Sequence, residues 1–175
     1  MTNLTRYALW LAPDEAASTQ LQSVIDQLAA SYSGPRFTPH MTLLGRVRGE
    51  EEELVEKTAS LAARLAPIET KATGFAGAPY YFRCFFAPLE SSSSLQQAVS
   101  EAAHHFGTNA EKDHTPHVSL LYGQIDREEK KKVPQQIGEK VPRHFTLDRL
   151  QLIRMSVSVS GWEMVTEAPL TGSGN

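Results

Sequence analysis

The chain has 175 residues, a formal net charge of −3 at pH 7, 41% hydrophobic residues and 21% charged residues. These values predict one globular domain, and the acidic balance argues against binding long duplex nucleic acid, which requires a basic face. The single cysteine, Cys84, excludes an internal disulfide and is typical of a reducing compartment. No apolar run is long enough to span a membrane, and residues 1–6 lack the layout of a signal peptide. We therefore expect a cytoplasmic protein without a membrane partner.

Strands and helices alternate along the predicted chain. The apolar run at 7–12 is typical of a strand ended by Pro13, and apolar residues spaced by three and four along 14–32 predict a helix with one buried stripe. In chain order we predict a strand at 7–12, a helix at 14–32, a strand at 39–44, a helix at 50–65, strands at 68–75 and 80–87, a helix after Pro88, a strand at 116–121, a helix from 126 that is short or kinked at Pro134, and strands at 145–154 and 162–165. Residues 171–175 are expected to form a disordered tail.

One short motif occurs twice in the chain. The pattern Pro-His-apolar-hydroxyl-Leu-Leu occupies 39–44 and returns at 116–121, and each copy follows a strand, an Ala-Pro pair, a helix and a loop. Because side chains alternate between the faces of a strand, the histidine and the hydroxyl two residues later point the same way. Each predicted motif strand therefore presents one imidazole and one hydroxyl on a common face.

The duplication also predicts the architecture. Two intertwined β-α-β-α-β repeats, at about 7–75 and 80–153, should form a single bilobal domain of residues 1–170. Each repeat is too small to bury its own sheet, so we expect the two to pack with pseudo-two-fold symmetry around a cleft. His40 and His117 should meet across that cleft, with Thr42 and Ser119 beside them.

A facing pair of histidines suits acid–base chemistry at phosphorus. Histidine titrates near pH 6.5, so a neutral imidazole can take a proton from water while a protonated one gives a proton to a leaving oxygen. The hydroxyls of Thr42 and Ser119 can donate to non-bridging phosphoryl oxygens without a metal. A lone His-x-Thr is more often structural, but packing alone does not require a histidine and a hydroxyl in both copies. The sequence leaves open which histidine is the base.

The two motifs resemble the signature tetrapeptides of the 2H (two-histidine) phosphoesterases, and their surroundings resemble the cyclic phosphodiesterase branch. The resemblance extends from about Tyr7 to Val165. It implies an α+β fold in which two antiparallel sheets line a central cleft with helices outside, and it places Tyr122 in the substrate pocket. It also implies hydrolysis without a metal or other cofactor. The implied substrates are ADP-ribose 1″,2″-cyclic phosphate, opened to ADP-ribose 1″-phosphate, and nucleoside 2′,3′-cyclic phosphates, opened to 2′-phosphates.

Aromatic residues are candidates for stacking on the base of a nucleotide. Trp10, on the first strand, is the preferred candidate, and Tyr80, Phe82 and Phe86 on the matching strand are the others, although such residues are more often core. Arg83 could neutralise phosphate charge, although a surface ion pair is the commoner role. We expect a monomer that acts on a small cyclic phosphate and forms no stable complex with nucleic acid.

Three alternatives stay open at this stage. A zinc site at His114 and His117, near His104 and His105, is disfavoured because residues three apart in an extended segment point to opposite faces and no cysteine completes the set. A protein of the same fold could instead act on linear 2′,5′-linked oligonucleotides or RNA ends. A nucleotide-binding module without turnover is the third alternative, and ligand-induced stabilisation without product would indicate it.

Overall fold

The computed structural model describes residues 5–174. Residues 1–4, which were expected to lack a signal peptide, and residue 175 of the predicted tail lie outside the described part. The elements are β1 (Tyr7–Pro13), α1 (Glu15–Tyr32), β2 (Met41–Val47), α2 (Glu51–Arg64), β3 (Ile68–Lys71), η1 (Tyr81–Arg83), β4 (Phe85–Pro88), α3 (Ser93–His105), β5 (His117–Leu121), α4 (Arg127–Ile137), η2 (Gly138–Lys140), β6 (His144–Arg154), η3 (Val159–Gly161) and β7 (Glu163–Pro169). No helix among the described residues has the length and apolar character needed to cross a membrane.

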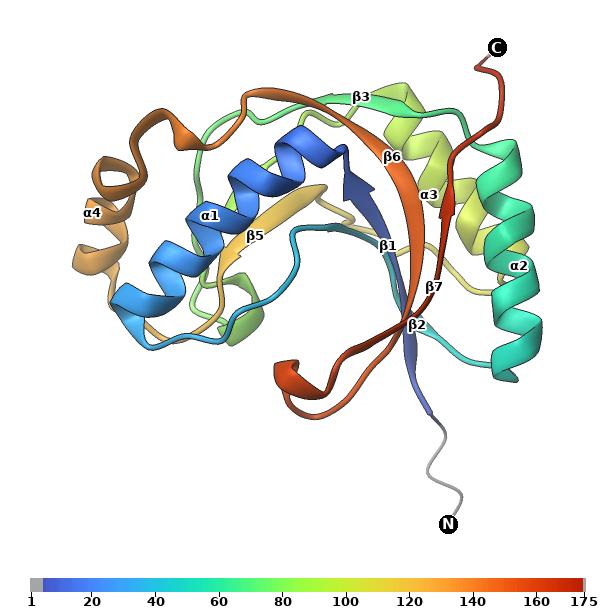
Figure 1. The fold of residues 1–175 in the computed structure, drawn as a ribbon, viewed down its shortest axis with the longest axis horizontal. Helices are drawn as coiled ribbons and strands as arrows, with labels where there is room; N and C mark the ends of the chain where they lie inside the picture. The colour runs from blue at the N-terminus through green and yellow to red at the C-terminus, as the bar shows by residue number, and fades with distance from the viewer. Residues whose placement is uncertain (1–4, 175) are drawn as a thin grey trace.

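The strands form one curled antiparallel sheet in the order β3-β6-β1-β2-β5-β4, and β7 pairs with residues 149–154 of β6 along the same edge that pairs with β3 at residues 144–147. Helices α1 and α4 lie on one side of the molecule and α2 and α3 on the other (Figure 1). The predicted α+β class, the antiparallel strands and the outer helices are confirmed. The two sheets expected from the family resemblance are, however, joined as halves of one sheet, because Met41 of β2 pairs with Val118 of β5.

The strand order is symmetric about this central β2–β5 pair. β1 lies beside β2 and β6 beside β1, while β4 lies beside β5 and the chain after β3 lies beside β4 through the bridges Ala72–Leu89 and Ala76–Phe86. Met41 and Val118 are the residues that directly follow the two motif histidines. The centre of the arrangement therefore lies at the duplicated motif.

Helix α1 has the acidic cap and the apolar stripe that its sequence predicts. The Asp14 carboxylate caps the helix by accepting from the Ala17 amide, at 3.0 Å, and also accepts from the Thr146 amide of β6, at 2.9 Å. The predicted apolar stripe is buried against the sheet: Leu21, Val24, Ile25 and Leu28. Helix α4, predicted to be short or kinked at Pro134, has 11 residues and continues through this proline to Ile137.

The aromatic segment at 80–87 is the clearest departure from the predicted elements. The expected strand is split into the short helix η1 and the four-residue strand β4. Its backbone groups are used in turns, since the Arg83 amide donates to Tyr80 and the Ala78 amide to the Arg83 carbonyl. The Tyr81 carbonyl accepts from the Gly123 amide beyond β5. These tertiary hydrogen bonds outweigh the high strand propensity of the aromatic residues.

The end of the chain is more ordered than predicted. The amides of Thr171 and Gly172 donate to the carbonyls of Ala62 and Leu65, which lie at the end of α2. The last carbonyls of a helix have no partner inside the helix and therefore attract such donors. The start of the predicted disordered tail is thus fixed against α2.

Candidate active site

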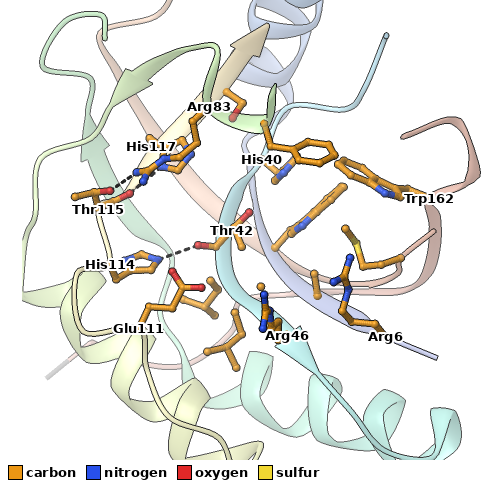
Figure 2. Close-up of a pocket in the computed structure, with 18 of the residues that line it drawn as sticks. Arg6, His40, Thr42, Arg46, Arg83, Glu111, His114, Thr115, His117 and Trp162 are labelled. Atoms are coloured by element: carbon orange, nitrogen blue, oxygen red, sulfur yellow. Dashed lines mark hydrogen bonds between the residues drawn. The ribbon is translucent and has the colours of Figure 1, made fainter. Parts of the chain in front are cut away.

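A cavity of about 720 Å³ contains the side chains of both motifs. Met41 and Val118 pair with each other and are buried in the core. Because side chains alternate along a strand, the preceding His40 and His117 project to the other side, where the cavity lies. Figure 2 shows the two imidazoles approaching this space from neighbouring strands. The structure therefore brings His40, Thr42, His117 and Ser119 together in one cavity wall, with Tyr122 and Trp10.

Both imidazoles are held in the same way. Nδ1 of His40 lies 2.7 Å from the Thr38 carbonyl oxygen, and Nδ1 of His117 lies 2.8 Å from the Thr115 carbonyl oxygen. A carbonyl can only accept, so each Nδ1 carries the hydrogen and each Nε2 is the nitrogen left for chemistry. The Thr-Pro-His sequence shared by the two copies supplies both pairs. The cavity thus contains two imidazoles with the same tautomer.

The aromatic neighbours of the two histidines differ. Trp10 pairs with Thr42, and Phe86 pairs with Ser119, so these two aromatic residues occupy equivalent positions in the two halves of the sheet. The Trp10 ring stacks on His40 with centroids 3.5 Å apart and planes 5° apart, whereas Phe86 is tilted by 56° to His117 at 4.9 Å. His40 is therefore enclosed by its neighbour more completely than His117.

This difference in surroundings changes the acidity of the two rings. Burial lowers the pKa of His40 from 6.5 to about 4, although the hydrogen bond to Thr38 opposes the shift and nearby His117 adds to it. Burial also lowers the pKa of His117, against the hydrogen bond to Thr115, and the Arg83 guanidinium lowers it further. At pH 7 the His40 ring is therefore neutral.

Hydroxyl donors line the same cavity as the imidazoles. Ser119 and Tyr122 are both buried in the cavity wall, and Tyr122 stacks on Phe37 with centroids 3.8 Å apart. Burial raises the pKa of Tyr122 well above its ordinary value, against a smaller effect of a hydrogen bond to Ser119. The phenol therefore stays protonated and able to donate. Thr42 lines the same wall.

The aromatic candidates are divided by the structure. Trp10 lines the cavity but is only 4% exposed, since its face is covered by His40 and its edge contacts Trp162. It supports the His40 ring and has little free surface for a base. Phe82, which is 47% exposed, and Trp162 also line the cavity and stack at 5.7 Å. Tyr80 and Phe86 do not line it, and Phe86 instead contacts His117.

Arg83 and His114 contribute to the wall through backbone and hydroxyl partners. Nη2 of Arg83 donates to the Thr115 hydroxyl, and its buried Nε has no partner among the described residues. Nε2 of His114 donates to the Thr42 carbonyl at 3.0 Å, which ties the loop before β5 to β2. Figure 2 shows Arg83 and His114 on either side of Thr115. Within the described residues, no three His, Cys, Asp or Glu side chains gather into a possible metal site.

The cavity residues that the sequence analysis did not single out include Arg6, Arg46 and Trp162. The two arginines could have been found from strand alternation, because Arg46 lies four positions after Thr42 and Arg6 four positions before Trp10. Trp162 follows a loop whose path no local pattern predicts.

The comparisons with known proteins identify the family of the chain. Residues 13–158 match the model of the 2′-5′ RNA ligase superfamily. The chain therefore belongs to this superfamily, that of the 2H phosphoesterases, and the predictions of the family and of a phosphodiesterase enzyme are confirmed.

Individual relatives span nearly the whole chain. A protein of Arabidopsis thaliana named cyclic phosphodiesterase is 26% identical over 170 residues, which cover 91% of this chain and 92% of the relative. A crystal structure of a Thermus thermophilus protein superposes with a TM-score of 0.61 at 18% identity, covering 97% of this chain and 100% of the other. Escherichia coli LigT complexed with 3′-AMP gives a TM-score of 0.60 at 12% identity, covering 97% and 99%. At these identities the two structures support the fold.

Proposed function

We propose that this protein hydrolyses small cyclic phosphodiesters without a metal. The proposed reactions are ADP-ribose 1″,2″-cyclic phosphate to ADP-ribose 1″-phosphate, nucleoside 2′,3′-cyclic phosphates to 2′-phosphates, or both. One observation carries the proposal: two imidazoles share one cavity, each with Nδ1 bound to a threonine carbonyl and with Nε2 unbonded among residues 5–174. The name of the Arabidopsis relative supports the same reaction class.

The surroundings of the two rings favour different roles. His40 is neutral at pH 7, so its Nε2 can accept a proton from the water that attacks phosphorus. His117 is more exposed, and a bound phosphate anion raises its pKa so that it becomes the proton donor. As the new oxygen–phosphorus bond forms, the bond to the 2″ or 3′ ribose oxygen breaks, and that oxygen takes the proton from His117. The proton from water remains on His40.

The hydroxyl groups complete the proposed mechanism. Thr42, Ser119 and Tyr122 can donate hydrogen bonds to the non-bridging oxygens, where negative charge is concentrated during the displacement. All three lie in the same wall as the histidines. Because Tyr122 is held protonated by its burial, it is a donor at every pH at which the protein acts.

A small substrate fits the rest of the molecule. A chain with a net charge of −3 has no overall attraction for a long polyanion. The one cysteine, Cys84, is free and buried, which suits a reducing compartment such as the cytoplasm. We therefore keep the proposal of a cytoplasmic monomer that acts on a low-molecular-weight substrate.

Phosphorus NMR tests the reaction directly. Each of the two cyclic phosphates is mixed with the protein in EDTA, and the position of the remaining phosphate identifies the oxygen that leaves. His117→Ala should slow ring opening by at least roughly a hundredfold. His104→Ala is the matched control, because His104 is exposed on α3 outside the cavity. Inhibition by EDTA with rescue by zinc would contradict the metal-free mechanism.

The assignment of base and acid needs a separate test. A phosphodiester with a p-nitrophenolate leaving group needs little proton donation, because that anion is stable near neutral pH. His117→Ala should then retain much of the rate with this substrate, whereas His40→Ala should lose it. The reverse pattern would exchange the two roles.

A second candidate reaction follows from the name of the matching superfamily. A linear 2′,5′-linked dinucleotide could occupy the same pair of histidines. The dinucleotide is therefore assayed beside adenosine 2′,3′-cyclic phosphate. Cleavage of the dinucleotide without ring opening would favour the linear substrate, and thermal stabilisation by nucleotides with no product from either would favour binding without turnover.

A further inference from the structure

We propose that Arg6 and Arg46 form a subsite for a second phosphoryl group of the substrate, located on the 5′ side of the sugar that carries the cyclic phosphate. This inference rests on the proposed function for the position of the cyclic phosphate. The chemical class it selects is a cyclic phosphate whose sugar also carries a 5′-monophosphate or 5′-diphosphate, in preference to a bare cyclic nucleoside phosphate.

Strand alternation directs both arginines to the cavity. Tyr7 of β1 pairs with Val47 of β2, and both side chains are buried in the core. The adjacent residues Arg6 and Arg46 therefore face the opposite side of the sheet, and both line the cavity. Figure 2 shows them in the same part of the site, on the side of Thr42 away from His117.

The spacing along the strands fits a single sugar. Trp10 and Thr42 are register partners beside the His40 ring. Arg6 lies four residues before Trp10, which corresponds to about 13 Å of extended chain, whereas the register shifts between β1 and β2 shorten the path from Thr42 to Arg46. A long arginine side chain reaches back over part of this distance. A phosphate bound between the histidines therefore leaves room for roughly one ribose before the guanidinium groups.

The charge of the cavity differs from that of the whole protein. Its lining includes three arginines and two carboxylates, Glu111 and Asp113, although the chain carries a net charge of −3. Arg83 already binds Thr115. Among residues 5–174, no carboxylate lies within 4.0 Å of the nitrogens of Arg6 or Arg46. Two guanidinium groups at one end of the cavity are thus available to an anion.

Arginine suits phosphate in particular. Its planar guanidinium can donate two parallel hydrogen bonds to phosphate oxygens, and such charge-assisted bonds are stronger than neutral ones. Thr108 and Asn109 line the same cavity and add polar side chains. Because the subsite is remote from the reacting atoms, it should lower KM for substrates with a 5′-phosphate and leave kcat nearly unchanged.

Binding of two product-like ligands tests the subsite without any turnover. Calorimetry compares adenosine 2′-phosphate with adenosine 2′,5′-bisphosphate, first for the wild type and then for the double variant Arg6→Gln/Arg46→Gln. Arg48→Gln is the matched control, since it removes the same charge two residues beyond Arg46 from a side chain outside the cavity. The wild type and the control should bind the bisphosphate at least about tenfold more tightly, because the charge-assisted bonds are added.

The double variant should bring the ratio of the two affinities close to one while the affinity for adenosine 2′-phosphate stays within about twofold. Higher ionic strength should reduce the wild-type ratio, because exposed charges are screened. A wild-type ratio near one would overturn the proposal. So would a double variant that weakens both ligands equally, because the arginines would then act on the shared 2′-phosphate or on the fold.

Kinetics separates this proposal from the proposed function. KM is measured for adenosine 2′,3′-cyclic phosphate, its 5′-phosphorylated form and ADP-ribose 1″,2″-cyclic phosphate, so that mono- and diphosphate groups are compared. Ring opening without any preference for a 5′-phosphate would contradict the proposed subsite and would support the catalytic proposal. A binding preference for the 5′-phosphate that depends on Arg6 and Arg46, without ring opening of any substrate, would support the subsite and contradict the catalytic proposal.

Discussion

His40 should make the protein sensitive to acid, and the size of the effect follows from its burial. The pKa of His40 is lowered from 6.5 to about 4, so between these values the unfolded chain binds a proton that the native ring does not. Stability contributed in this way is complete above pH 6.5 and is lost as the pH falls towards 4. Between pH 7.5 and pH 5, the free energy of unfolding should fall by about 2 kcal/mol because of this one ring.

Urea unfolding at the two pH values measures the effect in the wild type and in His40→Gln. The glutamine cannot titrate but keeps a polar side chain beside the Thr38 carbonyl. The difference between the two pH values should therefore be about 2 kcal/mol smaller in the variant, while contributions from all other groups cancel. NMR titration should place the His40 ring below pH 5. An equal loss of stability in both proteins, or a His40 pKa near 6.5, would refute the reasoning.

Three further changes test other parts of the site and the fold. Arg83→Gln should raise the pKa of His117 in NMR titration, because the guanidinium lowers it, and an unchanged pKa would contradict that contact. Tyr122→Phe should lower kcat by about tenfold or more without changing the thermal midpoint, because one donor to the phosphate is lost while the ring packing remains; equal kcat would remove the phenol from the mechanism. Asp14→Ala should lower the free energy of unfolding by about 1 kcal/mol in urea titrations, since the cap on the Ala17 amide is lost, and an unchanged midpoint would argue against that cap.

The duplicated motif explains why so much of the site was predictable. Strand alternation placed His40 and Thr42 on one face, and the same rule applied to His117 and Ser119. These four side chains lie together in the cavity. The rule needs only local extended backbone, which the apolar residues of each motif favour. It does not need knowledge of the loops.

The parts that escaped prediction depend on contacts between distant segments. The strand expected at 80–87 is split because the Tyr81 carbonyl accepts from Gly123, some forty residues away in the chain. The tail was expected to be disordered, but Thr171 and Gly172 bind the end of α2. Trp10 was a candidate for stacking on a base, but its face is covered by His40. Local propensity carries no information about any of these partners.

Identical motifs become chemically different through what surrounds them. The backbone fixes both imidazoles in the same way, through the Thr38 and Thr115 carbonyls, so the duplication alone would give two equivalent rings. The equivalence is broken by the neighbours on the adjacent strands: a parallel Trp10 stack encloses His40, whereas a tilted Phe86 leaves His117 more open. A base must be neutral and an acid must gain a proton from the solvent or substrate. A symmetric fold can therefore support an asymmetric reaction when the aromatic residue beside the histidine differs between the two halves.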